Sequence, residues 1–217
     1  MADWDELGKG ARERFEDGEA RLPDDPDQRQ RQLTRMGNAA GAAGLAALMS
    51  GGDGGDWFTR AAESYRLSWE HAPPGSWGRP IGAIKARILA GDWESAAADA
   101  RWALEAGTDE AQSPVGRYAA ALAFAVLGKW DDVRVHADYA RTHEAFPNEV
   151  ADALAFIAAE DVVGYIEAVE DVLESFETRN EYLEDMPVAD TVLVLQALAG
   201  RRHMAADLES PLLPPAR

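Results

Sequence analysis

The chain has no cysteine and only three lysines among its 217 residues. The absence of cysteine excludes disulfides, thiolate metal sites and cysteine nucleophiles. No apolar run reaches the roughly 20 residues of a spanning helix, so the sequence predicts no membrane segment. The N-terminus is acidic, whereas a secretory signal begins basic and continues apolar. We therefore expect a soluble cytoplasmic protein.

Negative charge dominates the composition. The 39 Asp and Glu residues outnumber 21 Lys and Arg, which leaves a net charge of -18. Nucleic acids and anionic membranes both require a basic surface, so we expect neither as a partner. Strong acidity with little lysine resembles the cytosolic proteins of salt-loving archaea. We therefore expect a halophilic cytoplasm.

One short motif repeats along the chain. Gly91-Asp92-Trp93-Glu94-Ser95-Ala96 is echoed by Gly55-Asp56-Trp57 and by Gly128-Lys129-Trp130, at spacings of 36 and 37 residues. A shift of 37 residues also superposes several helix-packing positions: Ala83 on Ala120, Ala86 on Ala123, Ala100 on Ala137, Trp102 on Tyr139 and Ala103 on Ala140. Repetition at this period is typical of stacked helical hairpins.

Apolar periodicity predicts helices through the rest of the chain. We expect one all-α domain of about eight or nine helices over residues 1–217. Residues 1–50 would form N-terminal helices, 51–178 the hairpin repeats, and 179–217 a capping helix and tail. Asp25 reads as an N-cap with Pro26 at the first helical position.

Residues 37–44 of the second expected helix are almost all small. An interior glycine costs a helix about 1 kcal/mol relative to alanine. We therefore expect another helix to approach this face closely, with a ligand resting on the glycines as the alternative.

The stretch from Gly91 to Ala96, followed by Ala100 and Ala103, resembles the second half of a tetratricopeptide repeat. The resemblance covers roughly residues 55–178, although the first helices depart from the family pattern. It implies antiparallel hairpins stacked in a superhelix that binds a protein or peptide. Position by position, the binding surface would include Ile81, Lys85, Tyr118 and Leu122. We add Trp77, because aromatic residues on loops often anchor interfaces. Lys85 as a simply solvated residue and Tyr118 as a packed one are the alternatives.

A fainter resemblance concerns the C-terminal third. Residues 190–199, followed by Ser210-Pro211-Leu212-Leu213-Pro214, are similar to the ending of the immunity protein 49 family. Those all-helical proteins are thought to neutralise a toxin domain by binding it. An acidic helical protein suits a basic toxin because complementary charge speeds association.

Signals for catalysis are weak. His136 and His143 are seven residues apart, about 10 Å along a helix, whereas metal pairs on helices are usually four apart. The acidic stripe over residues 167–177 fits a solvated helix face or an interaction patch. We therefore predict a non-catalytic protein- or peptide-binding scaffold without a cofactor. The alternatives are an immunity protein that binds a toxin, and an enzyme with a carboxylate or metal site inside the helical array.

The charge makes a direct prediction about salt. Self-repulsion among like charges opposes the compact state, and salt screens it. We expect the melting temperature to rise steeply between low and molar KCl in thermal unfolding followed by circular dichroism. A melting temperature that stays flat over this range would contradict the halophilic interpretation.

Overall fold

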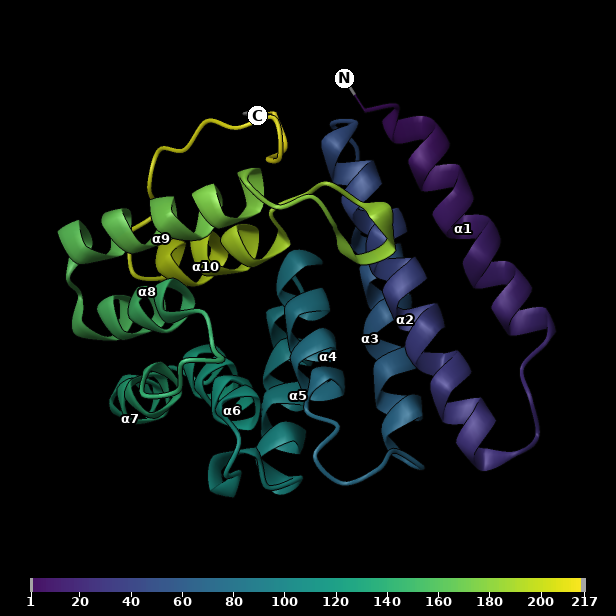
Figure 1. The fold of residues 1–217 in the computed structure, drawn as a ribbon, viewed down its shortest axis with the longest axis horizontal. Coiled ribbons are helices and arrows are strands. Elements are labelled where there is room, and N and C mark those ends of the chain that lie inside the picture. The colour runs from purple at the N-terminus through teal and green to yellow at the C-terminus, as the bar shows by residue number, and fades with distance from the viewer. Residues whose placement is uncertain (1, 216–217) are drawn as a thin grey trace. The chain divides into compact units, whose positions relative to one another are not determined.

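The computed structural model describes residues 2–215, and they form an all-helical fold without strands (Figure 1). Two 3-10 helices, η1 (Thr108–Glu110) and η2 (Leu183–Asp185), accompany ten α-helices in this part of the chain. The α-helices are α1 (Trp4–Ala20), α2 (Pro26–Met49), α3 (Gly55–Trp69), α4 (Gly78–Leu89), α5 (Trp93–Glu105), α6 (Pro114–Val126), α7 (Trp130–Arg141), α8 (Asn148–Ala159), α9 (Val162–Glu177) and α10 (Asp190–Gly200). None of these helices is long and apolar enough to cross a membrane. The all-α prediction is confirmed.

The chain folds into two compact units rather than one continuous body. The first contains residues 2–92, 180–188 and 211–215 of the described chain, and therefore α1–α4 and η2. The second contains residues 93–179 and 189–210, and therefore α5–α10 and η1. The first division falls inside the Gly91-Asp92-Trp93 motif.

Side chains cap the N-termini of α1, α2, α6 and α9. Asp3, Asp25, Ser113 and Asp161 each accept a hydrogen bond from the backbone N–H three residues later. Such caps satisfy one of the donors that a helix N-terminus leaves free. Pro26 follows Asp25 at the start of α2, as the sequence predicts.

Helices α2, α4, α6, α8 and α10 all end in the same turn. One residue adopts a left-handed conformation in each case, with φ between 57° and 76°: Gly51, Gly91, Gly128, Glu160 and His203. The next backbone N–H donates to the carbonyl five residues earlier: Gly52 to Ala47, Asp92 to Arg87, Lys129 to Phe124, Asp161 to Phe156 and Met204 to Ala199. This closure is the Schellman motif, and it lets the chain reverse tightly after a helix.

The expected third copy of the repeated turn is wrong. Gly55 and Trp57 lie within α3, so Gly55 begins a helix and does not follow one. Trp93 and Trp130, by contrast, are the first residues of α5 and α7. The turn that precedes α3 and matches those at Gly91 and Gly128 is at Gly51, at the end of α2.

Two consecutive arginines after α10 hold the second unit together. The guanidinium of Arg201 lies 4.5 Å from the ring centre of Trp93, and that of Arg202 lies 4.3 Å from Trp130. Both also donate to carbonyls that end helices, namely those of Val126 in α6 and Ala158 in α8. The repeated tryptophans therefore serve as platforms for a cation–π contact, and the arginines satisfy helix C-termini.

The small residues of α2 permit close contact with α3. A Cβ atom at Gly44 would lie 2.7 Å from the ring of Phe58, and one at Gly37 would lie 2.9 Å from Tyr65. A Cβ atom at Gly41 would meet no atom within 4 Å. Helix packing therefore explains Gly37 and Gly44, as predicted, but it does not explain Gly41.

This difference predicts opposite effects for two identical substitutions. Gly44→Ala should lower the free energy of unfolding by about 1–3 kcal/mol, because overpacking against Phe58 exceeds the gain in helix propensity. Gly41→Ala should raise it by about 0.5–1 kcal/mol. Urea denaturation of both variants tests this, and equal changes in the two midpoints would contradict the close-packing explanation.

Candidate functional site

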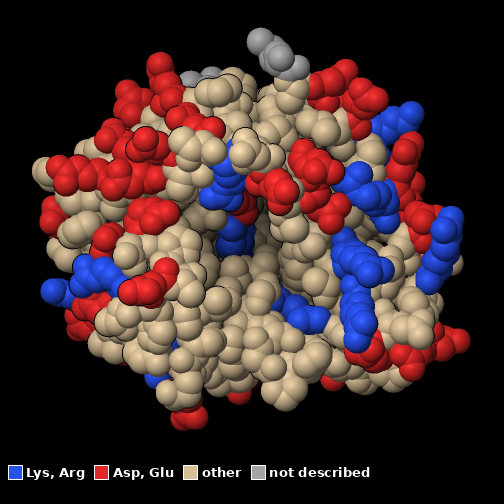
Figure 2. Space-filling model, in the orientation of Figure 1, with Lys and Arg blue, Asp and Glu red and all other residues tan. Residues whose placement is uncertain are grey.

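The acidity of the chain is concentrated in the second unit. This unit holds 21 of the 39 Asp and Glu residues but only 8 of the 21 Lys and Arg residues. Residues 142–178 alone contain ten Asp or Glu and no Lys or Arg. Figure 2 shows acidic side chains crowding the face over α9, at the upper left. The hairpin of α8 and α9 is therefore the most negative part of the unit.

Local sequence explains why these two helices pair. Glu160 takes the left-handed position after α8, and the carboxylate of Asp161 accepts from the N–H of Gly164 at 3.0 Å to cap α9. A Cβ atom at Gly164 would lie 2.7 Å from the ring of Phe156, so only glycine allows this close approach. The apolar faces are buried through Val150, Leu154, Ile157, Tyr165, Val169 and Val172. The hairpin is thus a well-packed support for what its outer positions carry.

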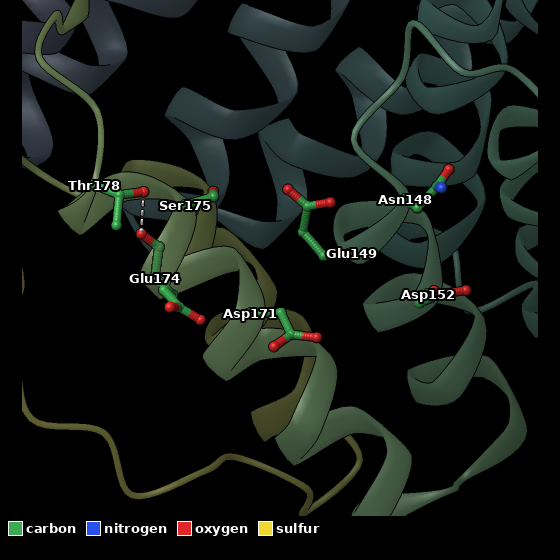
Figure 3. Close-up of a pocket in the computed structure, with 7 residues that line it drawn as sticks. All are labelled: Asn148, Glu149, Asp152, Asp171, Glu174, Ser175 and Thr178. Atoms are coloured by element: carbon green, nitrogen blue, oxygen red, sulfur yellow. Dashed lines mark hydrogen bonds between the residues drawn. The ribbon is translucent and has the colours of Figure 1, made fainter.

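An open groove of ≈ 470 Å³ lies between the outer faces of α8 and α9. Its lining residues are Asn148, Glu149, Asp152, Asp171, Glu174, Ser175 and Thr178. Figure 3 shows Glu149 and Asp152 on α8 opposite Asp171 and Glu174 on α9. The hydroxyls of Ser175 and Thr178 donate to carbonyls of their own helix, at 2.7 and 2.9 Å. Carboxylates are therefore the main polar groups that the groove offers to a ligand.

Few cations balance these carboxylates. Arg141 donates to Asp152 at 2.8 Å, and Arg202 pairs with Glu160. Asp171 and Glu174 have no Lys, Arg or His partner among residues 2–215. Glu174 also stands near the C-terminus of α9, where the helix dipole disfavours negative charge and the last turn carries no basic residue. The arrangement opposes stability and favours the approach of a cation.

The histidines are not gathered into a site. The ring of His136 stacks on Phe124 at 5.2 Å and lies 3.3 Å from Arg117, measured from Nδ1 to Nη1. Burial, together with the positive charge of Arg117, lowers the pKa of His136. His143 instead packs against Tyr139 at 4.9 Å. Within the described chain, no three His, Asp or Glu side chains are arranged to hold a metal ion.

The five residues predicted from the tetratricopeptide resemblance are divided between the units. Trp77, Ile81 and Lys85 lie in or next to α4 in the first unit, and all three are half-buried. Tyr118 and Leu122 lie on α6 in the second unit and are 8% and 0% exposed. The ring of Tyr118 packs on Phe146 at 5.4 Å. Tyr118 and Leu122 therefore offer a partner little or no surface in this conformation.

Sequence reasoning found the α9 side of the groove but missed the α8 side. The acidic stripe predicted over residues 167–177 includes Asp171 and Glu174. Glu149 and Asp152 were not predicted as part of a site. The available signal was the absence of Lys and Arg from residues 142–178, which joins the two helices into one acidic segment.

Comparisons of the chain with protein-family models, with curated proteins and with solved structures find no match. The resemblances to tetratricopeptide repeats and to immunity protein 49 therefore stay hypotheses. The groove has to be interpreted from its own geometry and charge.

The excess charge predicts a gain in stability on neutralisation. Asp171→Asn should raise the melting temperature at low salt, because like charges three or four residues apart destabilise a helix by about 0.2–0.5 kcal/mol per pair. The gain should vanish near 1 M KCl, where charges are screened within about 3 Å.

Asp138→Asn is the matched control for this prediction. Asp138 pairs with Arg141 at 2.8 Å, so the same substitution should give no gain. If Asp171→Asn and Asp138→Asn shift the melting temperature equally at low salt, the groove carries no excess repulsion.

Proposed function

We propose that this protein is a non-catalytic helical scaffold that binds a basic protein or peptide through the groove between α8 and α9. The observation that carries the proposal is the segment of residues 142–178, with ten carboxylates and no Lys or Arg, folded into one hairpin. A partner rich in Lys or Arg would supply the missing charge.

The exposed side of α9 supports a protein partner. Val163 is 67% exposed, and Glu167, Glu170 and Glu174 follow it at spacings of three or four residues, all exposed. Residues at these spacings share one face of a helix. The face therefore combines an apolar contact with a row of carboxylates, which suits a basic segment that also carries apolar side chains.

Electrostatics would act mainly on the rate of association and on specificity. Complementary charge steers a partner toward the site and suppresses wrong partners, whereas exposed ion pairs add little affinity each. The same groove would serve the more specific hypothesis of toxin neutralisation, because a basic nuclease domain presents the charge that the groove lacks.

Charge-matched variants test the proposal. The groove variant Glu149→Gln, Asp171→Asn, Glu174→Gln and the control variant Asp5→Asn, Glu16→Gln, Glu19→Gln each remove three negative charges, the control from exposed positions of α1. Both would be used, beside the wild type, to capture partners from native lysate, with identification by mass spectrometry. We expect basic partners to bind the wild type and the control but to lose about tenfold or more in affinity for the groove variant.

The salt dependence separates specific from general attraction. Association with the wild type should slow as KCl is raised, and the groove variant should show a weaker dependence. Capture that is the same for the groove variant and the wild type would exclude the groove as the binding site. An equal loss in both variants would show that net charge alone is responsible.

A further inference from the structure

One arginine of the first unit is held by neutral groups only. Arg79, in the first turn of α4, donates from Nε to the hydroxyl of Ser68 at 2.6 Å and from Nη2 to the side-chain oxygen of Gln30. These acceptors belong to α3 and α2. The guanidinium is therefore fixed where three helices meet.

The acceptors are themselves anchored. Ser68 and Gln30 are 0% and 2% exposed. The Ser68 hydroxyl also contacts the Thr34 hydroxyl at 2.7 Å and lies 2.9 Å from the carbonyl oxygen of Gln30. The amide of Gln30 donates to Asp27 at 3.1 Å. This network locks the plane of the Arg79 guanidinium before any ligand binds.

No carboxylate of residues 2–215 compensates the charge of Arg79. None lies within ion-pair distance of it, and the first turn of α4 contains no Asp or Glu. Asp27, the acid of the network, pairs with Arg31 at 2.8 Å instead. Burial lowers the pKa of the Arg79 guanidinium, and no neighbouring anion opposes that shift. A partly desolvated cation without a counter-ion is unusual in a protein with 39 acidic residues.

Part of the guanidinium remains free to donate. An arginine carries five N–H groups in one plane, and here only Nε and Nη2 have partners in the described chain. Every fully buried side-chain nitrogen or oxygen of the described chain has a hydrogen-bond partner. Nη1 of Arg79 has no such partner there. Nη1 is therefore not fully buried.

Two tryptophans that pack on each other are close to this network in the sequence. Trp69 follows Ser68 in α3, and Trp77 precedes Arg79 by two residues at the start of α4. The two indole rings lie 5.7 Å apart, tilted by 31°. Both tryptophans are half-buried.

We propose that Arg79 and the Trp69–Trp77 pair form a binding site for an organic carboxylate. One N–H of Nη1 donates to a carboxylate oxygen in a charge-assisted hydrogen bond, while Nε and Nη2 stay bonded to Ser68 and Gln30. The apolar part of the ligand lies against the indoles. This site belongs to the first unit and does not depend on the acidic groove, so either proposal can fail without the other.

Titration of the ¹⁵N-labelled full chain with sodium benzoate and sodium acetate tests the site, with sodium chloride at matched ionic strength as reference. We expect saturable shifts of the Arg79 Nε–H and Trp77 indole N–H resonances with both carboxylates and not with chloride. Benzoate should saturate at the lower concentration, because its ring can pack on tryptophan. Absence of a saturable shift at Arg79, or the same shift with chloride, would overturn the proposal. Equal affinities for benzoate and acetate would remove the tryptophans from the site.

Variants add a second test. Arg79→Lys keeps the charge but loses the planar fork, and we expect benzoate to bind about tenfold more weakly or worse. Arg79→Gln should abolish saturation. Arg35→Gln, at an exposed position of α2, is the matched control and should leave the benzoate titration unchanged. Unchanged binding in a folded Arg79 variant contradicts the proposal. If Arg79→Gln fails to fold, the wild-type titration and Arg79→Lys still decide the question.

Discussion

The left-handed turn that ends every second helix is the constraint on which the architecture depends. Gly51, Gly91 and Gly128 adopt it at little cost, whereas Glu160 and His203 hold a conformation that costs an L-residue roughly 1–2 kcal/mol. Both exceptions lie beside Arg202, which pairs with Glu160, donates to the end of α8 and directly precedes His203. The arginine pair after α10 therefore offsets strain at the turns and also covers the tryptophans that begin α5 and α7.

Local signals in the sequence were sufficient for the helices and for some of their ends. Asp25 and Pro26 mark the start of α2, and Gly91 and Gly128 mark turns, because caps and left-handed glycines act within a few residues. Gly55 also precedes Asp-Trp, but it does not mark a turn after a helix. Glycine is tolerated at the start of a helix as well as after its end, and Gly55 is the first residue of α3. Only the hydrogen bonds that close the preceding helix distinguish these two cases.

Long-range features were beyond what the sequence could show. Residues 180–188 belong to the first unit although α9 and α10 on either side belong to the second, and Arg14 bonds Glu184 across 170 positions. The acidic groove needs α8 and α9 packed side by side before Glu149 and Asp171 share a surface. Residues 71–91 around Arg79 contain no Asp or Glu, so the sequence shows that no local acid balances this charge. Only the packing of the other helices shows that no distant carboxylate of the described chain pairs with it either.

Both candidate sites are defined by charged side chains that lie on well-packed helices and have no ion-pair partner in the described chain. The fold alone does not specify a function, since similar helical arrays serve many. Packed helices can balance charge through neighbours, as Arg141 does for Asp152 and Arg202 does for Glu160. Asp171 and Glu174 in one unit, and Arg79 in the other, lack that balance. A ligand of opposite charge would relieve each imbalance. For this reason we propose a ligand of opposite charge for each site, a basic partner for the groove and an organic carboxylate for Arg79.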